Sequence, residues 1–123
     1  MDPAYLRAVQ IGRAALMFLT IAFTFLGAQS VVAEPVTVQI DHFQFGPQEL
    51  TVAPRTTVSW VNHDQTIHNI VLTEPKLTSP GLDTDDQYSF EFDHEGDYEY
   101  HCALHPQMVG VVHVRSPMKA GTE

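Results

Sequence analysis

The stretch Tyr100-His101-Cys102-Ala103-Leu104-His105-Pro106-Gln107-Met108 (YHCALHPQM) holds the only cysteine of the chain. His105 follows that cysteine after two intervening residues, and Met108 follows His105 at the same spacing. A thiolate, an imidazole and a thioether are soft or borderline ligands, and together they favour copper. The stretch therefore predicts a metal site that needs at least one further ligand from elsewhere in the chain.

Strand-like segments flank this stretch on both sides. Residues 96–101 (GDYEYH) alternate polar with mostly aromatic side chains, and residues 109–114 (VGVVHV) are rich in valine, so the stretch is predicted to be a loop between two strands. No segment after residue 33 shows a helical period, and about seven short strands at this spacing indicate an all-β antiparallel sandwich. The other predicted strands are residues 36–40, 49–52, 56–61, 67–72 and 88–92, with a loop at 73–86.

The N-terminus has the pattern of a secretory signal. Arg7 and Arg13 precede an uncharged apolar run at residues 14–25, and small residues follow up to Ala33. We expect a signal peptide at 1–33, with a signal helix, a folded domain at 34–115 and a flexible tail at 116–123. An uncleaved membrane anchor is the alternative, because residues 14–33 carry no charge and roughly 20 such residues can span a bilayer. Either way the domain is predicted to lie outside the cytoplasm, in the periplasm.

The predicted domain and tail are strongly acidic. Without Asp2, Arg7 and Arg13, the 15 acidic and 6 basic residues of the chain fall to 14 and 4, a net charge of −10. Nucleic acid and anionic membranes are therefore poor partners, and a basic protein surface is a better one. Cys102 has no partner for a disulfide within the chain, so in an oxidising compartment something must occupy its thiol.

A second histidine ligand must come from the six histidines other than His105. One cysteine and two histidines with a weak axial methionine form the blue-copper arrangement. His68 is the best candidate because it lies on an apolar predicted strand, whereas His63, in a turn, is the alternative. Zinc and a nucleophilic cysteine are rival interpretations, but structural zinc avoids thioethers and a nucleophile would leave Met108 without a purpose. The remaining histidines are not marked as ligands: His42 follows the first predicted strand, His94 lies in an acidic turn, His101 is predicted to point to the strand face opposite Cys102, and His113 lies on the last predicted strand.

The chain resembles the cupredoxins, the small blue-copper proteins of the plastocyanin, pseudoazurin and amicyanin group. The resemblance covers residues 36–114 and rests on the triplet HNI at His68 and on YEYHCALHPQMVGVVHV at residues 98–114. The short Cys-x2-His-x2-Met loop is most similar to that of amicyanin. The resemblance implies a cupredoxin-like Greek-key β-sandwich of about seven to eight strands.

The resemblance also implies the site and its use. It assigns His68, Cys102, His105 and Met108 as ligands of one copper ion that cycles between Cu(II) and Cu(I). It implies a monomeric, periplasmic type 1 copper protein that carries single electrons between redox partners docking near His105. The alternative is a periplasmic protein for copper storage, delivery or resistance. An enzyme is not expected, because copper oxidases and nitrite reductases need further histidine pairs and the sequence has no His-x-His.

Asn69, directly after His68, is a further expected contributor to the site. In the family an asparagine at this position hydrogen-bonds the loop around the cysteine, where a serine or threonine usually follows the cysteine. This chain has Ala103 there, which has no side-chain hydroxyl. We therefore expect Asn69 to bond the backbone of the loop.

Overall fold

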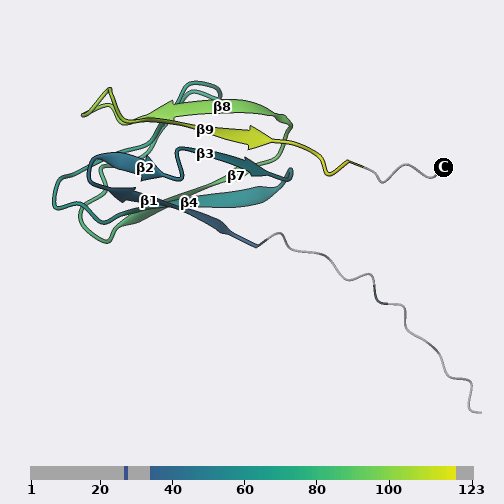
Figure 1. The fold of residues 1–123 in the computed structure, drawn as a ribbon, viewed down its shortest axis with the longest axis horizontal. Helices are drawn as coiled ribbons and strands as arrows, with labels where there is room; N and C mark the ends of the chain where they lie inside the picture. The colour runs from purple at the N-terminus through teal and green to yellow at the C-terminus, as the bar shows by residue number, and fades with distance from the viewer. Residues whose placement is uncertain (1–26, 28–33, 119–123) are drawn as a thin grey trace, which may run out of the picture. The chain divides into compact units, whose positions relative to one another are not determined.

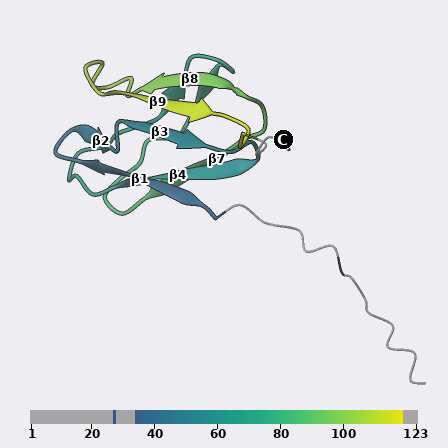
Figure 2. The same cartoon turned by 45° about the vertical axis from the view of Figure 1, so that its right-hand side comes forward.

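The computed structural model describes residues 34–118 together with Gly27. Residues 34–118 fold into two β-sheets that pack face to face and appear as two layers in Figures 1 and 2. This arrangement confirms the all-β sandwich. The predicted signal peptide or anchor, apart from Gly27, and residues 119–123 of the predicted tail lie outside the described residues.

The two sheets share nine strands within the described part of the chain. The first sheet has the order β2 (Gln44–Gly46), β1 (Val36–Asp41), β4 (Thr56–Asn62) and β7 (Gln87–Phe92). The second sheet has the order β3 (Glu49–Val52), β9 (Val109–Val114), β8 (Gly96–His101), β5 (Val71–Leu72) and β6 (Leu77–Thr78). Within residues 34–118 and Gly27 we find no helix of sufficient length and hydropathy to cross a membrane.

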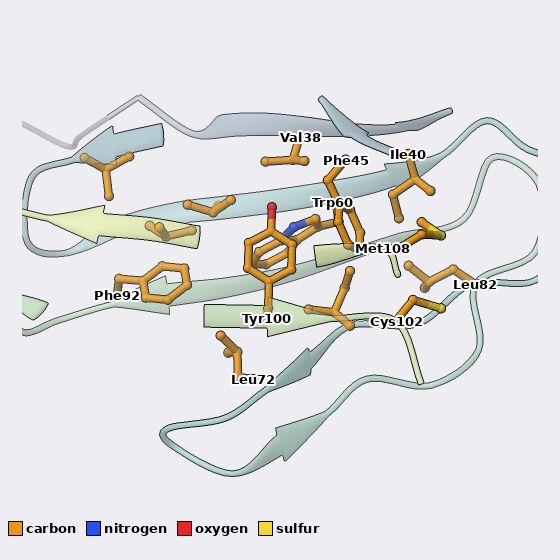
Figure 3. Close-up of a cluster of buried hydrophobic side chains, with 14 of the residues drawn as sticks. Val38, Ile40, Phe45, Trp60, Leu72, Leu82, Phe92, Tyr100, Cys102 and Met108 are labelled. Carbon is orange, nitrogen blue, oxygen red and sulfur yellow. The ribbon is translucent and has the colours of Figure 1, made fainter. Parts of the chain in front are cut away.

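The core lies between the sheets, and every second residue along a strand points into it. Alternate residues of β4 are buried, with Trp60 fully enclosed, and Tyr100 of β8 reaches it from the opposite sheet. The two rings meet edge to face with their centroids 5.2 Å apart (Figure 3). Burial raises the pKa of the Tyr100 hydroxyl to about 12, so this group stays protonated and places no charge in the core.

Two strand pairs are parallel, which corrects the expectation of a purely antiparallel sandwich. β1 pairs with β4 in parallel, with Val38 opposite Trp60, and β3 pairs with β9 in parallel, with Leu50 opposite Val112. The reason lies in the path of the chain. Both β2 and β3 run back from the end of β1, and β3 does so in the other sheet, so β4 starts at the same end as β1.

Apart from one-residue shifts at the ends of β1, β4 and β7, the strands differ from the prediction in three places. β2 and β6 are extra short strands of three and two residues, which brings the total to nine. The strand predicted at 67–72 shrinks to β5, and His68 is held instead by an isolated bridge to Leu82. Its neighbour there is a loop containing Pro80, which has no N–H to continue a ladder.

Candidate metal centre

Three ligand side chains from two distant segments meet at the end of the sandwich where β8 ends. The Nδ1 atoms of His68 and His105 are 3.1 Å apart. The sulfur of Cys102 lies 3.8 Å from Nδ1 of His68 and 3.7 Å from Nδ1 of His105. Within the described residues, this is the only cluster of three or more histidine, cysteine or acidic side chains with metal-binding spacing.

The spacing of these three atoms fits a single metal ion. First-row metals bind imidazole nitrogen at about 2.0–2.1 Å and thiolate sulfur at about 2.3 Å. Three such ligands spread evenly in one plane around an ion would stand about 3.5 Å apart for the two nitrogens and about 3.8 Å for nitrogen and sulfur. The observed separations from sulfur to nitrogen match this expectation, and the two nitrogens lie slightly closer than it requires.

Met108 closes the loop that carries Cys102 and His105. The N–H of Cys102 donates to the carbonyl of Met108 at 3.1 Å, and the N–H of Met108 donates to the carbonyl of His105 at 2.9 Å. The Met108 side chain is buried at the same end of the core as Cys102, next to Leu82 and Ile40 (Figure 3). A buried thioether at the same end of the core as one thiolate and two imidazoles would complete the blue-copper ligand set as a weak donor to copper.

His68 is fixed from both its backbone and its ring. Its N–H and carbonyl form the bridge with Leu82, at 3.2 and 2.7 Å. Its Nε2 donates to a carboxylate oxygen of Asp64 at 2.8 Å, which leaves Nδ1 free to face the metal. Burial raises the pKa of Asp64, but the N–H groups of Phe43 and His42 and the His68 ring outweigh it, so the pKa of Asp64 lies below its ordinary value.

Asn69 bonds the backbone of the ligand loop, as the sequence predicts. Its side-chain oxygen accepts the N–H of Ala103 at 2.8 Å. Because Asn69 follows His68 and Ala103 follows Cys102, this one bond joins the two segments that carry the ligands. The absence of a hydroxyl at position 103 therefore does not prevent the connection.

The other histidines lie outside the triad formed by His68, Cys102 and His105. The His63 ring bonds the side chain of Gln39, and His63 is not part of that triad. His101 precedes Cys102 on the strand and is only half-buried, which fits its predicted position on the opposite face. The remaining three lie on the surface or pair with nearby acids: His42 with Asp41, His113 with Asp97, and the exposed His94.

A comparison with protein families agrees with this geometry. Residues 32–115 match the model of the copper-binding proteins of the plastocyanin/azurin family. The chain belongs to this family. It is a cupredoxin whose His68, Cys102, His105 and Met108 form a type 1 copper site, and copper is the cofactor that this ligand set suits.

Known relatives of this cupredoxin include amicyanins. It is 35% identical to the amicyanin of Paracoccus denitrificans over 90 residues, which cover 69% of each protein. A Cu(I) structure of an amicyanin variant superposes with a TM-score of 0.64 and 31% identity, covering 66% of this chain and 82% of the other. A copper-containing nitrite reductase from Thermus scotoductus gives the same TM-score and identity, covering 69% of this chain but only 23% of the enzyme.

Three residues that shape the site of this cupredoxin escape the sequence analysis. Asp64 bonds His68, Phe43 packs against two ligand rings, and Asn62 donates to the carbonyls of Thr66 and Leu82, at 2.9 and 2.8 Å, beneath the site. Asn62 ends β4 and Asp64 follows it beside His63, in the predicted turn, and such polar residues indicate only a turn. Phe43 lies between the predicted strands at 36–40 and 49–52, where no local pattern distinguishes it, and it is 43% exposed.

Proposed function

We propose that this cupredoxin carries single electrons between redox proteins. The observation that supports the proposal is the unequal exposure of the ligands. Cys102 and His68 are fully buried and Met108 is 2% exposed, whereas the His105 ring is only partly covered. His105 is therefore the one ligand through which an electron could pass over a short distance from a docked protein.

The surface around His105 is suited to a brief protein contact. Leu104, which precedes His105, is 58% exposed, and Phe43, whose ring lies 5.0 Å from the His105 ring, is 43% exposed, so large apolar side chains lie beside the imidazole. Redox encounters have small interfaces, and a limited apolar patch is enough for them. We propose that the electron donor and acceptor both dock here, one at a time, on a monomer.

The protein contributes a fixed geometry rather than a reactive group. Bound copper supplies a one-electron couple between Cu(II) and Cu(I). The chain holds the ligands on a loop closed by hydrogen bonds, between strands β8 and β9 that pair along their whole length. Ligands held on rigid elements move little between the two oxidation states, which favours fast transfer.

The test is an optical spectrum and a voltammogram of the copper-loaded protein. We expect an intense visible band from thiolate-to-copper charge transfer and a reversible one-electron wave. His68→Ala should abolish the band, and His63→Ala, the matched histidine outside the triad, should keep it. A spectrum without this band in the wild type would refute the electron-carrier proposal.

The same measurements separate the carrier from the alternative role in copper storage, delivery or resistance. A carrier retains copper in both oxidation states and exchanges electrons rapidly between its own copies. A delivery protein gives up Cu(I) quickly to a competing chelator and has no reversible wave. Rapid loss of Cu(I) to a chelator, with slow electron exchange, would favour copper handling.

We further propose that the partners of this carrier are cationic at their docking surface. Acidic side chains gather near the copper end, where Asp85 is 83% exposed and Asp41 53% exposed, with Asp83 and Asp86 in the same loop as Asp85. Arg55 and Arg115 lie at the other end, since Arg55 precedes β4 and Arg115 follows β9. A negative margin around an apolar centre attracts a positively charged partner and raises the rate of encounter.

Small redox probes test this charge preference. Oxidation of the reduced protein by an anionic complex such as ferricyanide should speed up with added salt, and reduction by hexaammineruthenium(II) should slow down. The double variant Asp83→Asn, Asp85→Asn should weaken both salt effects. The matched pair at the far end, Glu91→Gln with Asp93→Asn, should leave them nearly unchanged, and equal effects of the two pairs would contradict the proposal.

We propose the periplasm as the site of action. The support is the N-terminal pattern of the sequence together with an unpaired cysteine that serves as a metal ligand and thereby avoids oxidation. Cell fractionation followed by mass spectrometry of the N-terminus tests both this location and the cleavage after Ala33. Recovery of the intact chain from the membrane fraction would favour the anchor, and recovery from the cytoplasm would overturn the proposal.

A further inference from the structure

The turn between β1 and β2 has an unusual backbone. His42 and Phe43 have φ angles of 50° and 58°, so two consecutive residues with side chains lie in the left-handed region. Tight hairpin turns of this kind normally contain glycine or asparagine at these positions, because a Cβ atom is disfavoured there. Something outside the turn must therefore hold it in this conformation.

The carboxylate of Asp64 holds the turn. One of its oxygens accepts the N–H of His42 at 2.7 Å, and the other accepts the N–H of Phe43 at 2.9 Å. Asp64 comes from the loop after β4 and its side chain is only 10% exposed, while its own N–H donates to Asn62 at 2.9 Å. The carboxylate is thus fixed in place, with both turn N–H groups directed at it.

The same carboxylate also contacts the copper site. The Asp64 oxygen that accepts a hydrogen bond from the N–H of Phe43 also accepts one from Nε2–H of the ligand His68, at 2.8 Å. The Phe43 ring meets the rings of both ligand histidines edge to face, with its centroid 5.2 Å from His68 and 5.0 Å from His105. Asp64 therefore contacts the ligand His68 directly. It also affects His68 and His105 indirectly, because its hydrogen bond orients Phe43, which packs against both rings.

We propose that Asp64 is a positioning residue that links the conformation of the 41–44 turn to the two histidine ligands. It orients His68 from behind, and by fixing the turn it holds Phe43 against His68 and His105. Phe43 then limits the movement of both imidazoles on the side facing solvent. This proposal rests on the copper site and not on the electron-carrier role, so either one can fail without the other.

The first test compares Asp64→Ala with Asp64→Asn. In copper-free Asp64→Ala, the amide hydrogens of His42 and Phe43 should exchange faster with solvent than in the wild type. Copper affinity should fall about 10–100-fold, the range found when a partner of a ligating histidine is removed. Asp64→Asn keeps one acceptor oxygen, so it should restore part of the amide protection while the copper midpoint potential rises through loss of the negative charge.

The second test asks whether Asp64 acts through Phe43. Phe43→Ala leaves the acceptors of the turn intact and removes a half-exposed ring, so it is expected to fold and to loosen both histidines. If Asp64 works partly through this ring, the losses in copper affinity for Asp64→Ala and Phe43→Ala should be clearly non-additive in the double variant. The exposed Asp93→Asn serves as the control for loss of a carboxylate and should change neither affinity nor amide exchange.

Two results would overturn the proposal. Unchanged exchange at His42 and Phe43 in both Asp64 variants would show that the carboxylate does not hold the turn. Additive losses of copper affinity would show that Asp64 acts on His68 alone. If Asp64→Ala does not fold, the comparison of the two single variants with the double variant is made with Asp64→Asn, because asparagine has nearly the same shape as aspartate.

Discussion

Asn69 provides one of the few bonds that join the two ligand-bearing segments. Its oxygen accepts the Ala103 N–H at 2.8 Å, on a part-exposed loop where water can replace the lost acceptor. Asn69→Ala should therefore lower the free energy of unfolding of the copper-free protein by about 0.5–1.5 kcal/mol, the usual net contribution of one hydrogen bond. Urea denaturation measures this loss. Asn69→Asp keeps an acceptor oxygen and should be closer to the wild type, so equal losses in both variants would argue against the bond.

Met108 is the ligand whose removal should change the copper without expelling it. Leucine has a similar volume, so Met108→Leu should cost less than about 1.5 kcal/mol in stability while removing the thioether. The three remaining ligands should retain copper, and the midpoint potential should rise because the thioether would help to stabilise Cu(II). Voltammetry measures the shift. Met118→Leu is the matched control, since Met118 is 95% exposed and far along the chain from the loop, and an equal shift there would contradict the assignment.

At the scale of the elements, the pairing of β8 with β9 depends on one glycine. Tyr100 lies directly opposite Gly110, and a Cβ atom added at Gly110 would come within 2.4 Å of the Tyr100 ring. That ring is enclosed by the core and cannot move aside. Gly110→Ala should therefore overpack the junction and destabilise the protein by about 1–3 kcal/mol. In thermal unfolding, Gly46→Ala is the control because a Cβ there meets only Gln39 O, at 3.9 Å. Comparable losses at both glycines would disprove the steric argument.

The ligand loop and its two strands are the part of the fold that the sequence predicts best. Residues 96–101 and 109–114 alternate regularly, and the observed β8 and β9 have those bounds. Local patterns are sufficient to predict these strands and the loop, because the alternation of a strand and the spacing of the ligands depend only on residues close together in sequence. The short strands β2 and β6 carry too few residues to show a period. The predicted strand at His68 was shortened by a pairing partner that contains Pro80, which lies far from it in sequence.

The contacts that complete the site could not be predicted for the same reason. Asp64 and the His42–Phe43 turn are separated by more than 20 positions, and the parallel pairing of β1 with β4 in the first sheet, with Ile40 opposite Asn62, brings them together. Nothing local in the sequence distinguishes Asp64 from its neighbouring acids on the surface. The ligands themselves were predictable because a lone cysteine with this spacing is rare, whereas an aspartate in a turn is common.

At the scale of the whole molecule, the core and the copper site are largely separate. Most of the buried apolar residues belong to the strands, and only Cys102 and Met108 among them are ligands. Trp60 packs against Tyr100 and Phe92 without contributing to the metal site, and Phe92 lies toward the end of the core away from Cys102 and Met108 (Figure 3). The site therefore sits at one end of a core that can form without copper.

Removal of copper should accordingly leave the fold intact but less stable. A ligand that binds only the native state stabilises it by about 2.7 kcal/mol at a free concentration of 100 times Kd and about 4.1 kcal/mol at 1,000 times Kd. The copper-free protein should keep its far-ultraviolet circular dichroism and unfold cooperatively at a lower temperature, because His68 and His105 stay in place through Asp64, Phe43 and the loop bonds. Calorimetry with and without copper measures the shift. Cys102→Ser, which removes the thiolate, should lose most of the increase in unfolding temperature that copper gives the wild type. A copper-free protein that lacks β-structure would show instead that the metal is required for folding.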